Sequence, residues 1–527
     1  MVYLNGQEAG HNPSTGKVYY SSNKDMWIGM VQAPMKPSDI HREHGTLAGW
    51  FALDGNLDEL KIYNRALTSE QIKAEYVANQ PKLDPDILPR KMPSGPNGPG
   101  HFGAYYCKLK YYDGWDDLWP VADDPDVLVR FDKSPVKVVF WRGTRYSPTW
   151  VSENGLWMGD QSVETWGMGE DDKEGCFEHM QDRHCLYSHV RIIENTDARV
   201  VVHWRYAPVS SHNHLWTEDE KTGWALWVDE YYYIYPDAMG IRNVSWKKGT
   251  LGVARQFQES LPFLQPGQIT GDVLNVDWVS VGNIEGKKET LSFKENPKRG
   301  ELYSQNNDFN IQLYNFKSEY KPFILFEPGN QMDLGRVQNI VTLSFHDGCN
   351  HWPVGQASCD GRESVAADRP SHTMSFPISD PVIHEKEDRC YWNGLYGMTQ
   401  KSIEELMLVQ KSWVQAPRLS IQTSGFISEG YDVGERAYLI SRKEINNDAI
   451  IELDIDASKE SPLYNPCFVL KNWGETIPKF EIAEEYPKSG DKFRAGLYRT
   501  LEGTNLIIWL DYLSTQPVKI KINPVLN

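Results

Sequence analysis

The sequence lacks several patterns that mark common protein classes. No apolar run approaches the length of a transmembrane helix, so we expect no membrane span. The seven cysteines show no CxxC spacing, which argues against zinc-knuckle and thioredoxin-type motifs. No GxSxG nucleophile elbow occurs, which argues against a Ser-His-Asp hydrolase. No signal peptide is visible at Met1, but the first domain reads as cut in half, so this absence carries little information.

The charge balance is strongly acidic. Lys and Arg number 54 against 72 Asp and Glu, and the resulting net charge of −18 disfavours nucleic acid and anionic membranes as partners. An acidic chain still binds an anionic polymer where its basic residues are concentrated locally. The 19 Trp and 27 Tyr residues favour a protein that stacks on flat surfaces such as sugar rings.

Longer-range patterns limit the fold. Long helical periodicity is absent before residue 400, which argues against an (α/α) toroid and a TIM barrel. No repeat of about 40 to 50 residues is seen, which argues against a propeller. Strand-like runs recur instead, at 127–131, 136–143, 224–236, 243–249 and 323–328. We therefore expect an all-β protein with a large antiparallel two-sheet β-sandwich over residues 104–417, the catalytic region, and a small β-sandwich over residues 418–527. One helix is expected from Ser402 to Trp413, before Pro417.

The first 80 residues resemble the last part of a laminin-G-like, concanavalin-type jelly roll. The resemblance lies in a strand with Asp-Glu-Leu-Lys-Ile-Tyr, an Arg-Ala-Leu-Thr turn and a closing helix, with Thr68 and Gln71 spaced as a capping box. It covers about half of such a domain. Residues 81–103 are rich in proline and glycine and are expected to form a linker.

The segment from Tyr187 to Ala207 predicts a β-hairpin, because apolar residues alternate along both halves. A three-residue loop at 196–198 brings both apolar sets to one face. On the other face, His189 then lies opposite Arg205, and Arg191 lies opposite His203. Like charges directly opposite each other are destabilising. This block therefore needs an anion, either acidic residues from neighbouring strands or a ligand.

Polar and aromatic residues also gather in the stretches 115–119, 176–189, 231–242 and 345–372. The last is a long loop with tryptophan and several ionisable groups, which is rarely only a connector. We expect these stretches to line a cleft together with the hairpin. The residues expected to bind substrate there are Trp115, Arg191, Arg242, His351, Trp352, Arg362 and His372.

No metal ligands are assigned. His346, Asp347 and His351 form one candidate set and His212 with His214 a second, but neither spacing matches a strong zinc signature. We expect that no cofactor is required, and a structural calcium or zinc ion stays open. Cys176 and Cys185 flank a loop and are a candidate disulfide if the protein is exported.

The combination of His, Tyr and Arg suits β-elimination in a uronic-acid polysaccharide. A cation neutralises the uronate carboxylate, a base removes the C5 proton, and an acid protonates the leaving glycosidic oxygen. His203 and His189, with Arg205 and Arg191, are the candidates for base and charge neutralisation. Tyr233, or its neighbours Tyr231 and Tyr235, is the candidate acid.

Two alternatives stay open. A glycoside hydrolase needs a pair of carboxylates, and spacing alone selects no pair from Glu178, Asp182, Asp229 and Glu230. A non-catalytic glycan-binding protein would use the tryptophans and the basic block as an anchor.

Several segments between residues 100 and 420 resemble a known family. They are WMGDQSVETWG, CFEHMQDRHCLYSH with the hairpin, DEYYYIYPDAMGIR, NHWPVGQASCDGR with DRPSH, and YGMT. They are similar to secreted bacterial proteins that carry a laminin-G-like domain and lie close to a polysaccharide lyase family that cleaves ulvan. The resemblance implies a sulfated polymer of rhamnose and uronic acid as substrate, an unsaturated uronate as product, and a secreted, periplasmic or cell-surface location. We expect a monomer.

Overall fold

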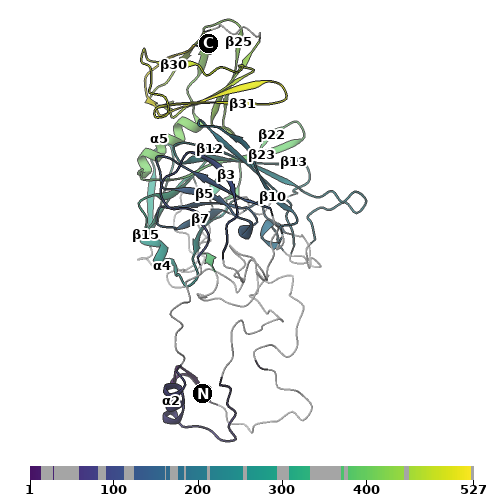
Figure 1. The fold of residues 1–527 in the computed structure, drawn as a ribbon, viewed down its shortest axis with the longest axis vertical. Coiled ribbons are helices and arrows are strands. Elements are labelled where there is room, and N and C mark those ends of the chain that lie inside the picture. The colour runs from purple at the N-terminus through teal and green to yellow at the C-terminus, as the bar shows by residue number, and fades with distance from the viewer. Residues whose placement is uncertain are drawn as a thin grey trace. The chain divides into compact units, whose positions relative to one another are not determined.

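The computed structural model describes residues 1–13, 28, 59–80, 91–111, 124–160, 162–166, 176–182, 185–210, 214–252, 258–292, 308–332, 370–372, 378–443 and 450–523 (Figure 1). The chain divides into two compact units, Met1–Ser38 with Leu47–Pro89 and Asp39–Thr46 with Arg90–Asn527. Among the described residues, no helix has the length and apolar character needed to cross a membrane. Four expected substrate contacts lie outside the described residues: Trp115, His351, Trp352 and Arg362.

In the first unit, β1 (Val2–Leu4) pairs antiparallel with β2 (Gln7–Gly10), and α2 spans Ser69–Ala78. The Thr68 hydroxyl accepts a hydrogen bond from the Gln71 backbone N–H at 3.3 Å, and the Gln71 side chain accepts one from the Thr68 N–H at 3.1 Å. This confirms the capping box that begins the helix. Most of the rest of the segment for which the sequence predicts a laminin-G-like domain lies outside the described residues.

The second unit contains a sheet of seven strands in the order β20-β14-β7-β6-β5-β4-β3. Its strands are β3 (Gly103–Cys107), β4 (Asp126–Arg130), β5 (Lys137–Phe140), β6 (Pro148–Val151), β7 (Trp157–Asp160), β14 (Ser260–Leu264) and β20 (Ser371–His372).

A ten-stranded sheet has the order β10-β11-β12-β13-β23-β18-β17-β15-β16, with β22 beside β23. Its strands are β10 (Ser188–Asn195), β11 (Val200–Tyr206), β12 (Val228–Tyr235), β13 (Met239–Lys247), β15 (Leu274–Gly282), β16 (Lys288–Ser292), β17 (Ile311–Phe316), β18 (Lys321–Phe326), β22 (His384–Lys386) and β23 (Arg389–Thr399).

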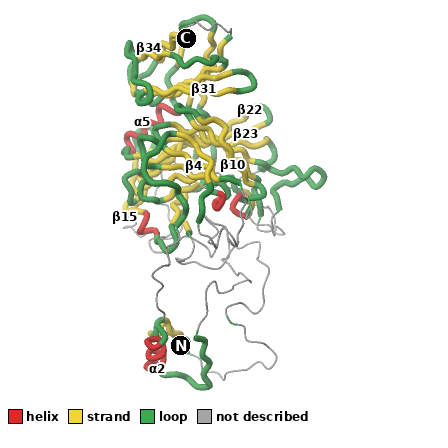
Figure 2. The backbone as a smooth tube through the Cα atoms, viewed as in Figure 1, coloured by secondary structure: helices red, strands yellow, loops and turns green. Residues whose placement is uncertain are grey.

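One hydrophobic core joins these two sheets. Val138 and Trp150 of the seven-stranded sheet belong to the same buried cluster as Val202, Trp204 and Tyr232 of the ten-stranded sheet. All described strand pairs within the two sheets are antiparallel, among them β10 with β11 and β6 with β7. Strands also far outnumber helices (Figure 2). The expected all-β, antiparallel two-sheet sandwich is therefore confirmed.

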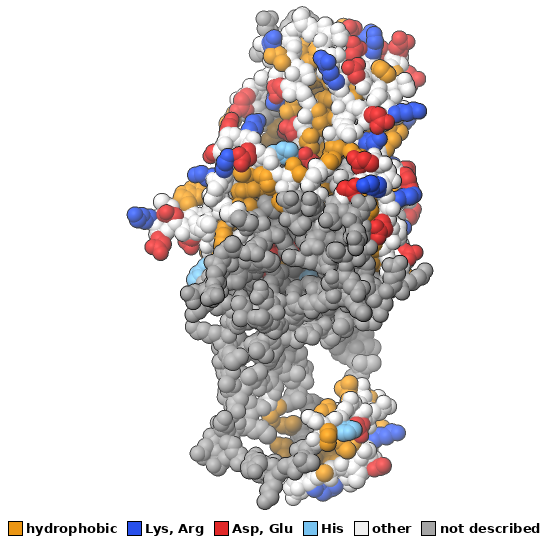
Figure 3. All heavy atoms as spheres, turned by 180° about the vertical axis from the view of Figure 1, so that it is seen from behind, with side chains coloured by type: hydrophobic (Ala, Val, Ile, Leu, Met, Phe, Trp, Pro, Cys, Tyr) orange, Lys and Arg blue, Asp and Glu red, His pale blue; other side chains and the backbone are white. Residues whose placement is uncertain are grey.

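A second sandwich follows Pro417. One sheet has the order β24-β27-β34-β30 and the other β25-β26-β29-β32-β31, and both contribute to a separate buried cluster that includes Ile440, Leu453, Phe468 and Ile508. The strands are β24 (Leu419–Ile421), β25 (Phe426–Asp432), β26 (Ala437–Arg442), β27 (Ile451–Ile455), β29 (Cys467–Lys471), β30 (Lys479–Ile482), β31 (Phe493–Arg499), β32 (Thr504–Leu510) and β34 (Val518–Asn523). Charged side chains of both signs are spread over its surface (Figure 3).

Short elements complete the described fold. The two-stranded pairs are β8 (Thr165–Trp166) with β9 (Cys176–Phe177), β19 (Gln331–Met332) with β21 (Ile378–Asp380), and β28 (Leu463–Tyr464) with β33 (Leu513–Ser514). The short helices are η1 (Arg142–Thr144), η2 (His179–Gln181) and α4 (Thr270–Val273).

Helix α5 (Ile403–Val414) confirms the helix expected from the sequence. Its apolar side, with Leu406, Val409 and Trp413, shares a buried cluster with Ile241 of β13 and Leu395 of β23. Part of the ten-stranded sheet's face away from the seven-stranded sheet is therefore covered by α5. We call this face the outer face.

The segment expected as a linker is packed in its second half. Met92 is buried, and its N–H donates to the Gln265 side-chain oxygen at 2.7 Å. Residues 91–103 therefore belong to the large sandwich, while residues 81–90 lie outside the described residues.

Candidate functional site

The β10–β11 hairpin has the cross-strand pairs that the sequence predicts. His189 lies opposite Arg205, and Arg191 lies opposite His203. The predicted three-residue loop is wrong, because Asn195 pairs with Val200 and the loop contains residues 196–199. A β-bulge between Ile192 and Glu194 restores the expected register.

The longer turn is explained by Arg199. Its guanidinium bonds the Glu194 carboxylate at 2.7 and 3.0 Å and the Glu435 carboxylate at 2.8 Å. Thr196 closes the turn by donating its hydroxyl to the Arg199 carbonyl at 3.0 Å. The turn is thus shaped by a buried ion pair that includes a residue of the C-terminal sandwich.

The register across β11, β12 and β13 creates two polar rows on the outer face. His203 of β11 lies opposite Tyr231 of β12, and Tyr231 lies opposite Asn243 of β13. In the next row, Arg205 lies opposite Asp229, and Asp229 lies opposite Ser245. Because side chains alternate between the two faces of a strand, these rows point away from the core. We call the following set the outer polar strip: Arg191, His203, Arg205, Asp229, Tyr231, Ser245 and Arg389.

His203 lies at the centre of the outer polar strip with both ring nitrogens engaged. Its Nε2 is 2.9 Å from Asp229 Oδ1, and its Nδ1 accepts a hydrogen bond from Arg191 Nε at 3.1 Å. Since Arg191 offers only donors, Nδ1 carries the lone pair, and we assign the proton to Nε2. The ring is 4% exposed and stacks on Tyr231 with centroids 4.4 Å apart.

Asp229 joins most of the outer polar strip. Its Oδ2 accepts from Arg389 Nη2 at 2.8 Å, and its Oδ1 lies 3.4 Å from Arg205 Nη1. Arg389 Nη2 also donates to Ser245 Oγ at 2.9 Å. Burial acts to raise the pKa of Asp229, but the His203 hydrogen bond and the two arginines outweigh burial and hold this pKa below its usual value.

The charge of the outer polar strip is positive. The guanidinium groups of Arg191, Arg205 and Arg389 are accompanied by the Asp229 carboxylate, so three positive charges meet one negative charge while His203 is neutral. A neighbouring strand thus supplies one of the anions that the predicted block requires. The excess of two positive charges favours binding of an anionic ligand.

Tyr231 provides a protonated phenol beside His203. The side chain is half-buried, and burial, followed by the Asp229 charge, raises its pKa. The phenol therefore keeps its proton at neutral pH. Within the described part of the chain, no hydrogen bond to its hydroxyl is found.

Tyr233 and Tyr235 share the face of Tyr231 but lie nearer the C-terminal sandwich. The Arg199 guanidinium lies 5.2 Å above the Tyr233 ring, whose centroid is 6.5 Å from that of Tyr231. The Tyr235 hydroxyl donates to the Glu435 carbonyl. Of the three candidate acids, Tyr231 is the one that stacks on His203.

A second aromatic group lies beside the strip at Trp227, directly before β12. The Arg205 guanidinium is 4.9 Å from the centroid of the Trp227 ring. His189 is exposed, and its ring is nearly parallel to Trp227 with centroids 6.3 Å apart.

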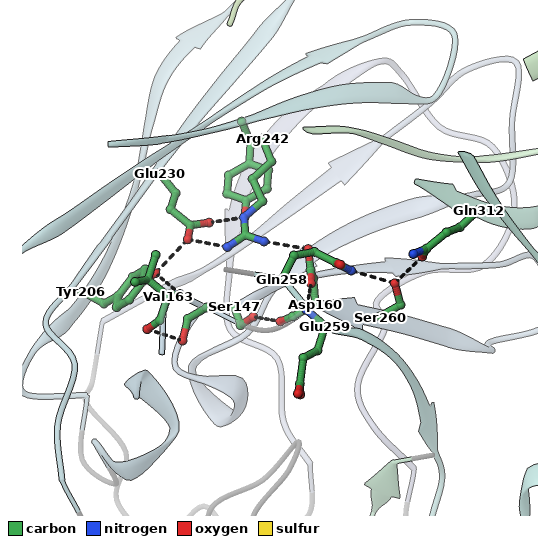
Figure 4. A network of polar contacts seen from close by, with 12 residues as sticks. Ser147, Asp160, Val163, Tyr206, Glu230, Arg242, Gln258, Glu259, Ser260 and Gln312 are labelled. Atoms are coloured by element: carbon green, nitrogen blue, oxygen red, sulfur yellow. Dashed lines mark hydrogen bonds and ion pairs between the residues drawn. The ribbon is translucent and has the colours of Figure 1, made fainter. Parts of the chain in front are cut away.

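Arg242 lies on the opposite face of the sheet, and the expectation that it contacts substrate beside the hairpin is corrected. Its Nη2 bonds Glu230 Oε1 at 2.8 Å, and its Nη1 bonds Asp160 Oδ2 at 2.7 Å (Figure 4). The side chain is 1% exposed, and the Tyr206 hydroxyl also donates to Glu230 at 2.9 Å. Arg242 therefore links the two sheets through the buried acidic side chains of Asp160 and Glu230.

His372 is likewise separate from the outer polar strip. It lies on β20, opposite Phe263 of β14 in the seven-stranded sheet, and is buried. The described structure thus brings together His203, Arg205 and Arg191, with His189 beside them, and leaves Arg242 and His372 in the interior.

The carboxylates considered for a glycoside hydrolase do not converge on the outer face. Asp229 and Glu230 are adjacent on β12 and so point to opposite faces. Asp182 accepts the N–H groups of Leu186 and Tyr187 at 2.8 Å, and Glu178 is buried. Among these four candidates, Asp229 alone belongs to the outer polar strip, whereas a glycosidase needs two facing carboxylates.

None of the cysteines and candidate metal ligands that the structure describes belongs to the outer polar strip. Cys185 is a free thiol that donates to the Arg142 carbonyl at 3.3 Å, so the candidate disulfide with Cys176 is not formed. Within the ranges that the structure describes, no three His, Cys, Asp or Glu side chains come together as a metal site. The candidates His346, Asp347, His351 and His212 lie outside these ranges.

Three residues of the outer polar strip, Asp229, Ser245 and Arg389, were not assigned to it from the sequence. Asp229 was considered only as a glycosidase carboxylate, although the alternation along 227–236 places it on the face of Tyr231. Arg389 is 160 residues from Asp229 and carries no local signal for this contact.

Comparisons with known proteins reveal only distant structural similarity. No family model and no curated protein matches the chain. Galactose 1-epimerase from Lactobacillus acidophilus NCFM aligns with a TM-score of 0.25 and 10% identity, over 56% of this chain and 99% of the epimerase. Two heparinase III structures align with TM-scores of 0.23 and 0.22 and identities of 10% and 8%, over 73% and 67% of this chain. The matches span 50% and 40% of the heparinase III chains. Similarity this low establishes neither a shared fold nor a shared activity.

Proposed function

We propose that the protein is a polysaccharide lyase that cleaves a uronate-containing anionic glycan by β-elimination on the outer polar strip. The observation that carries the proposal is the placement of His203 between Asp229, at Nε2, and Arg191, at Nδ1. This arrangement combines a neutral imidazole, a carboxylate that orients it and an exposed cation that suits a substrate carboxylate.

Substrate binding makes the base available. Arg191 is exposed, and its guanidinium is the group that covers His203 Nδ1. A uronate carboxylate is a stronger acceptor for this guanidinium than a neutral imidazole, because both partners are charged. When Arg191 turns to the carboxylate, the lone pair on His203 Nδ1 becomes free.

Proton removal then uses the Asp229–His203 pair. His203 Nδ1 takes the C5 proton, and the electrons of the C5–H bond move into the uronate carboxylate, where Arg191 and Arg205 stabilise the added charge. Asp229 stabilises the resulting imidazolium through its hydrogen bond to Nε2.

Loss of the leaving group completes the reaction. The electrons form the C4–C5 double bond as the C4–O bond breaks, and the leaving oxygen takes a proton from the Tyr231 phenol. The proton on His203 returns to the Tyr231 phenolate through solvent. The products are an unsaturated uronate and a free hydroxyl, so atoms and charge balance.

For the polymer, we propose ulvan, on the strength of the sequence motifs between residues 100 and 420. The sulfate and uronate groups of ulvan match the positive charge of the outer polar strip. Ulvan, glucuronan and glycosaminoglycans are incubated separately with the full chain, and the ultraviolet absorbance of unsaturated uronates is followed. We expect a rise with ulvan.

The outcomes of this assay separate the alternatives. No rise with any of the three polymers would contradict the lyase. New reducing ends without absorbance would indicate a hydrolase instead. Retention of the protein on ulvan without shortening of the polymer would indicate a binding protein. The positive charge of the outer polar strip also suits binding without cleavage.

A further inference from the structure

Trp227, Arg205 and His189 form a group directly beside the proposed reaction centre. Arg205 links the two places, because one Nη atom lies 3.4 Å from Asp229 while the guanidinium carbon lies 4.9 Å from the centroid of the Trp227 ring. His189 and Arg205 are opposite each other on β10 and β11, two residues along from the Arg191–His203 pair. Two residues of a strand span about 6.7 Å, so the two pairs occupy neighbouring positions on the same face of the hairpin.

The group presents an aromatic surface together with unused donors. Trp227 is half-buried, which leaves part of the indole accessible. The Arg205 side chain is 37% exposed and makes one long contact with Asp229, so most of its five N–H donors remain available. The His189 imidazole is exposed and reaches toward the same indole.

We propose that Trp227, Arg205 and His189 form a second subsite, which binds the monosaccharide next to the cleaved uronate and requires an anionic group, such as a sulfate ester, on that sugar. The indole contacts the sugar ring, and Arg205 with His189 donates to the anion. The proposal rests on the proposed function for the position of the cleaved bond.

The subsite predicts a preference that the reaction centre alone does not. The uronate carboxylate is the anion at His203, whereas the adjacent subsite senses charge on a different sugar. A polymer that keeps its uronates and loses its sulfates should therefore retain the chemistry of cleavage and lose affinity.

Affinity electrophoresis of the full chain in gels with ulvan or chemically desulfated ulvan tests the subsite without requiring turnover. Trp227→Ala and His189→Gln are compared with Trp224→Ala, a matched control in which a tryptophan that is 65% exposed is removed from the same loop. In gels that contain ulvan, we expect the dissociation constants of Trp227→Ala and His189→Gln for ulvan to rise by about tenfold. This is the scale of losing a cation–π or charged contact. We expect Trp224→Ala to match the wild type.

Desulfated ulvan identifies the anion requirement. We expect wild-type protein to bind it about tenfold more weakly than ulvan, and His189→Gln to cause no further loss, since the partner of His189 is absent. In kinetic assays on ulvan, we expect Trp227→Ala to raise KM while kcat stays near that of the wild type.

Three results would overturn the subsite. They are wild-type affinity in folded Trp227→Ala, equal affinity of wild-type protein for the sulfated and desulfated polymers, and retardation of wild-type protein by neither polymer. Retardation that depends on Trp227 without any unsaturated product would contradict the lyase chemistry while supporting the subsite, so the two failures are distinguishable.

Discussion

Asp229 Oδ1 lies 2.9 Å from His203 Nε2. The two residues project from the outer face of neighbouring strands, Asp229 from β12 and His203 from β11. The hydrogen bond orients the imidazole and directs its second nitrogen toward Arg191. In the proposed reaction, a carboxylate in this position also stabilises the charge that the ring gains as a base.

Asp229→Asn tests this relationship with little change of shape. The amide cannot stabilise an imidazolium as a carboxylate does, so we expect kcat on ulvan to fall by about 10² to 10⁴. Initial rates of unsaturated uronate formation measure the effect. Asp454→Asn, a half-exposed position on β27 in the C-terminal sandwich, is the matched control and should retain wild-type rates. Equal rates in both variants would show that Asp229 only satisfies the arginines.

The identity of the acid is tested by Tyr231→Phe and Tyr233→Phe. Both substitutions keep the ring and remove the hydroxyl, but only Tyr231 stacks on His203. We expect kcat to fall by about 100-fold for Tyr231→Phe and by only a few fold for Tyr233→Phe. Steady-state kinetics distinguish the two. A larger fall in kcat for Tyr233→Phe than for Tyr231→Phe would identify Tyr233, beside Arg199, as the acid.

Asp160 makes stability depend on pH. Burial, opposed by the Arg242 charge and assisted by the Glu230 charge, raises the pKa of Asp160 to about 7. Between about pH 4, the usual value for Asp, and about pH 7, the folded state holds a proton that the unfolded chain has lost. This contribution to stability is present below that window and is lost as the pH rises through it.

Thermal unfolding of wild-type protein and Asp160→Asn across pH 4 to 8 measures this dependence, since an amide does not titrate. We expect the loss of Tm with rising pH to be smaller in Asp160→Asn. Identical pH profiles would show that Asp160 has an ordinary pKa in the folded state.

The C-terminal sandwich is expected to support the β10–β11 hairpin directly. Glu435 bonds Arg199 at 2.8 Å in the hairpin turn. At Gly496 of β31, a Cβ atom would lie 2.4 Å from that of Thr196, so the backbone of β31 closely approaches the same turn.

Glu435→Ala should therefore lower both stability and kcat. We expect the free energy of unfolding to fall by about 1 to 3 kcal/mol, the scale of a lost hydrogen bond to a charged group, because Glu194 still pairs with Arg199. The control Glu429→Ala removes a surface contact to Lys471 and should change the free energy of unfolding by less than about 1 kcal/mol. Denaturant unfolding and initial rates provide the readouts. Equal stability and rates in the two variants would show that the C-terminal sandwich is an independent appendage.

Much of the fold follows from local patterns. Alternation predicts the antiparallel strands, Thr68 and Gln71 predict the start of α2, and Pro417 marks the end of the helical pattern of α5. Alternation also predicts the pairing of Arg191 with His203. The bulge beside Ile193 could not be predicted in this way, because the turn depends on the contact of Arg199 with Glu435, a residue 236 positions later.

The site was less predictable because local alternation does not determine which face a residue adopts in the complete sheet. Arg242 lies opposite Tyr232, and this register places it on the opposite face from Tyr231. The turn at 236–238, with a positive φ of 56° at Ala238, sets that register. Asp229 could have been found from the β11–β12 register, whereas Arg389 required the complete sheet order.

The most direct test of the central proposal is the rate of unsaturated uronate formation from ulvan by wild-type protein and His203→Gln. Circular dichroism and thermal unfolding verify that the variant is folded, and His11→Ala, an exposed histidine in the first unit, is the matched control. We predict measurable turnover in the wild type, a loss of more than about 100-fold in His203→Gln, and no loss in His11→Ala. Wild-type turnover in folded His203→Gln would contradict the assignment of His203 as the base.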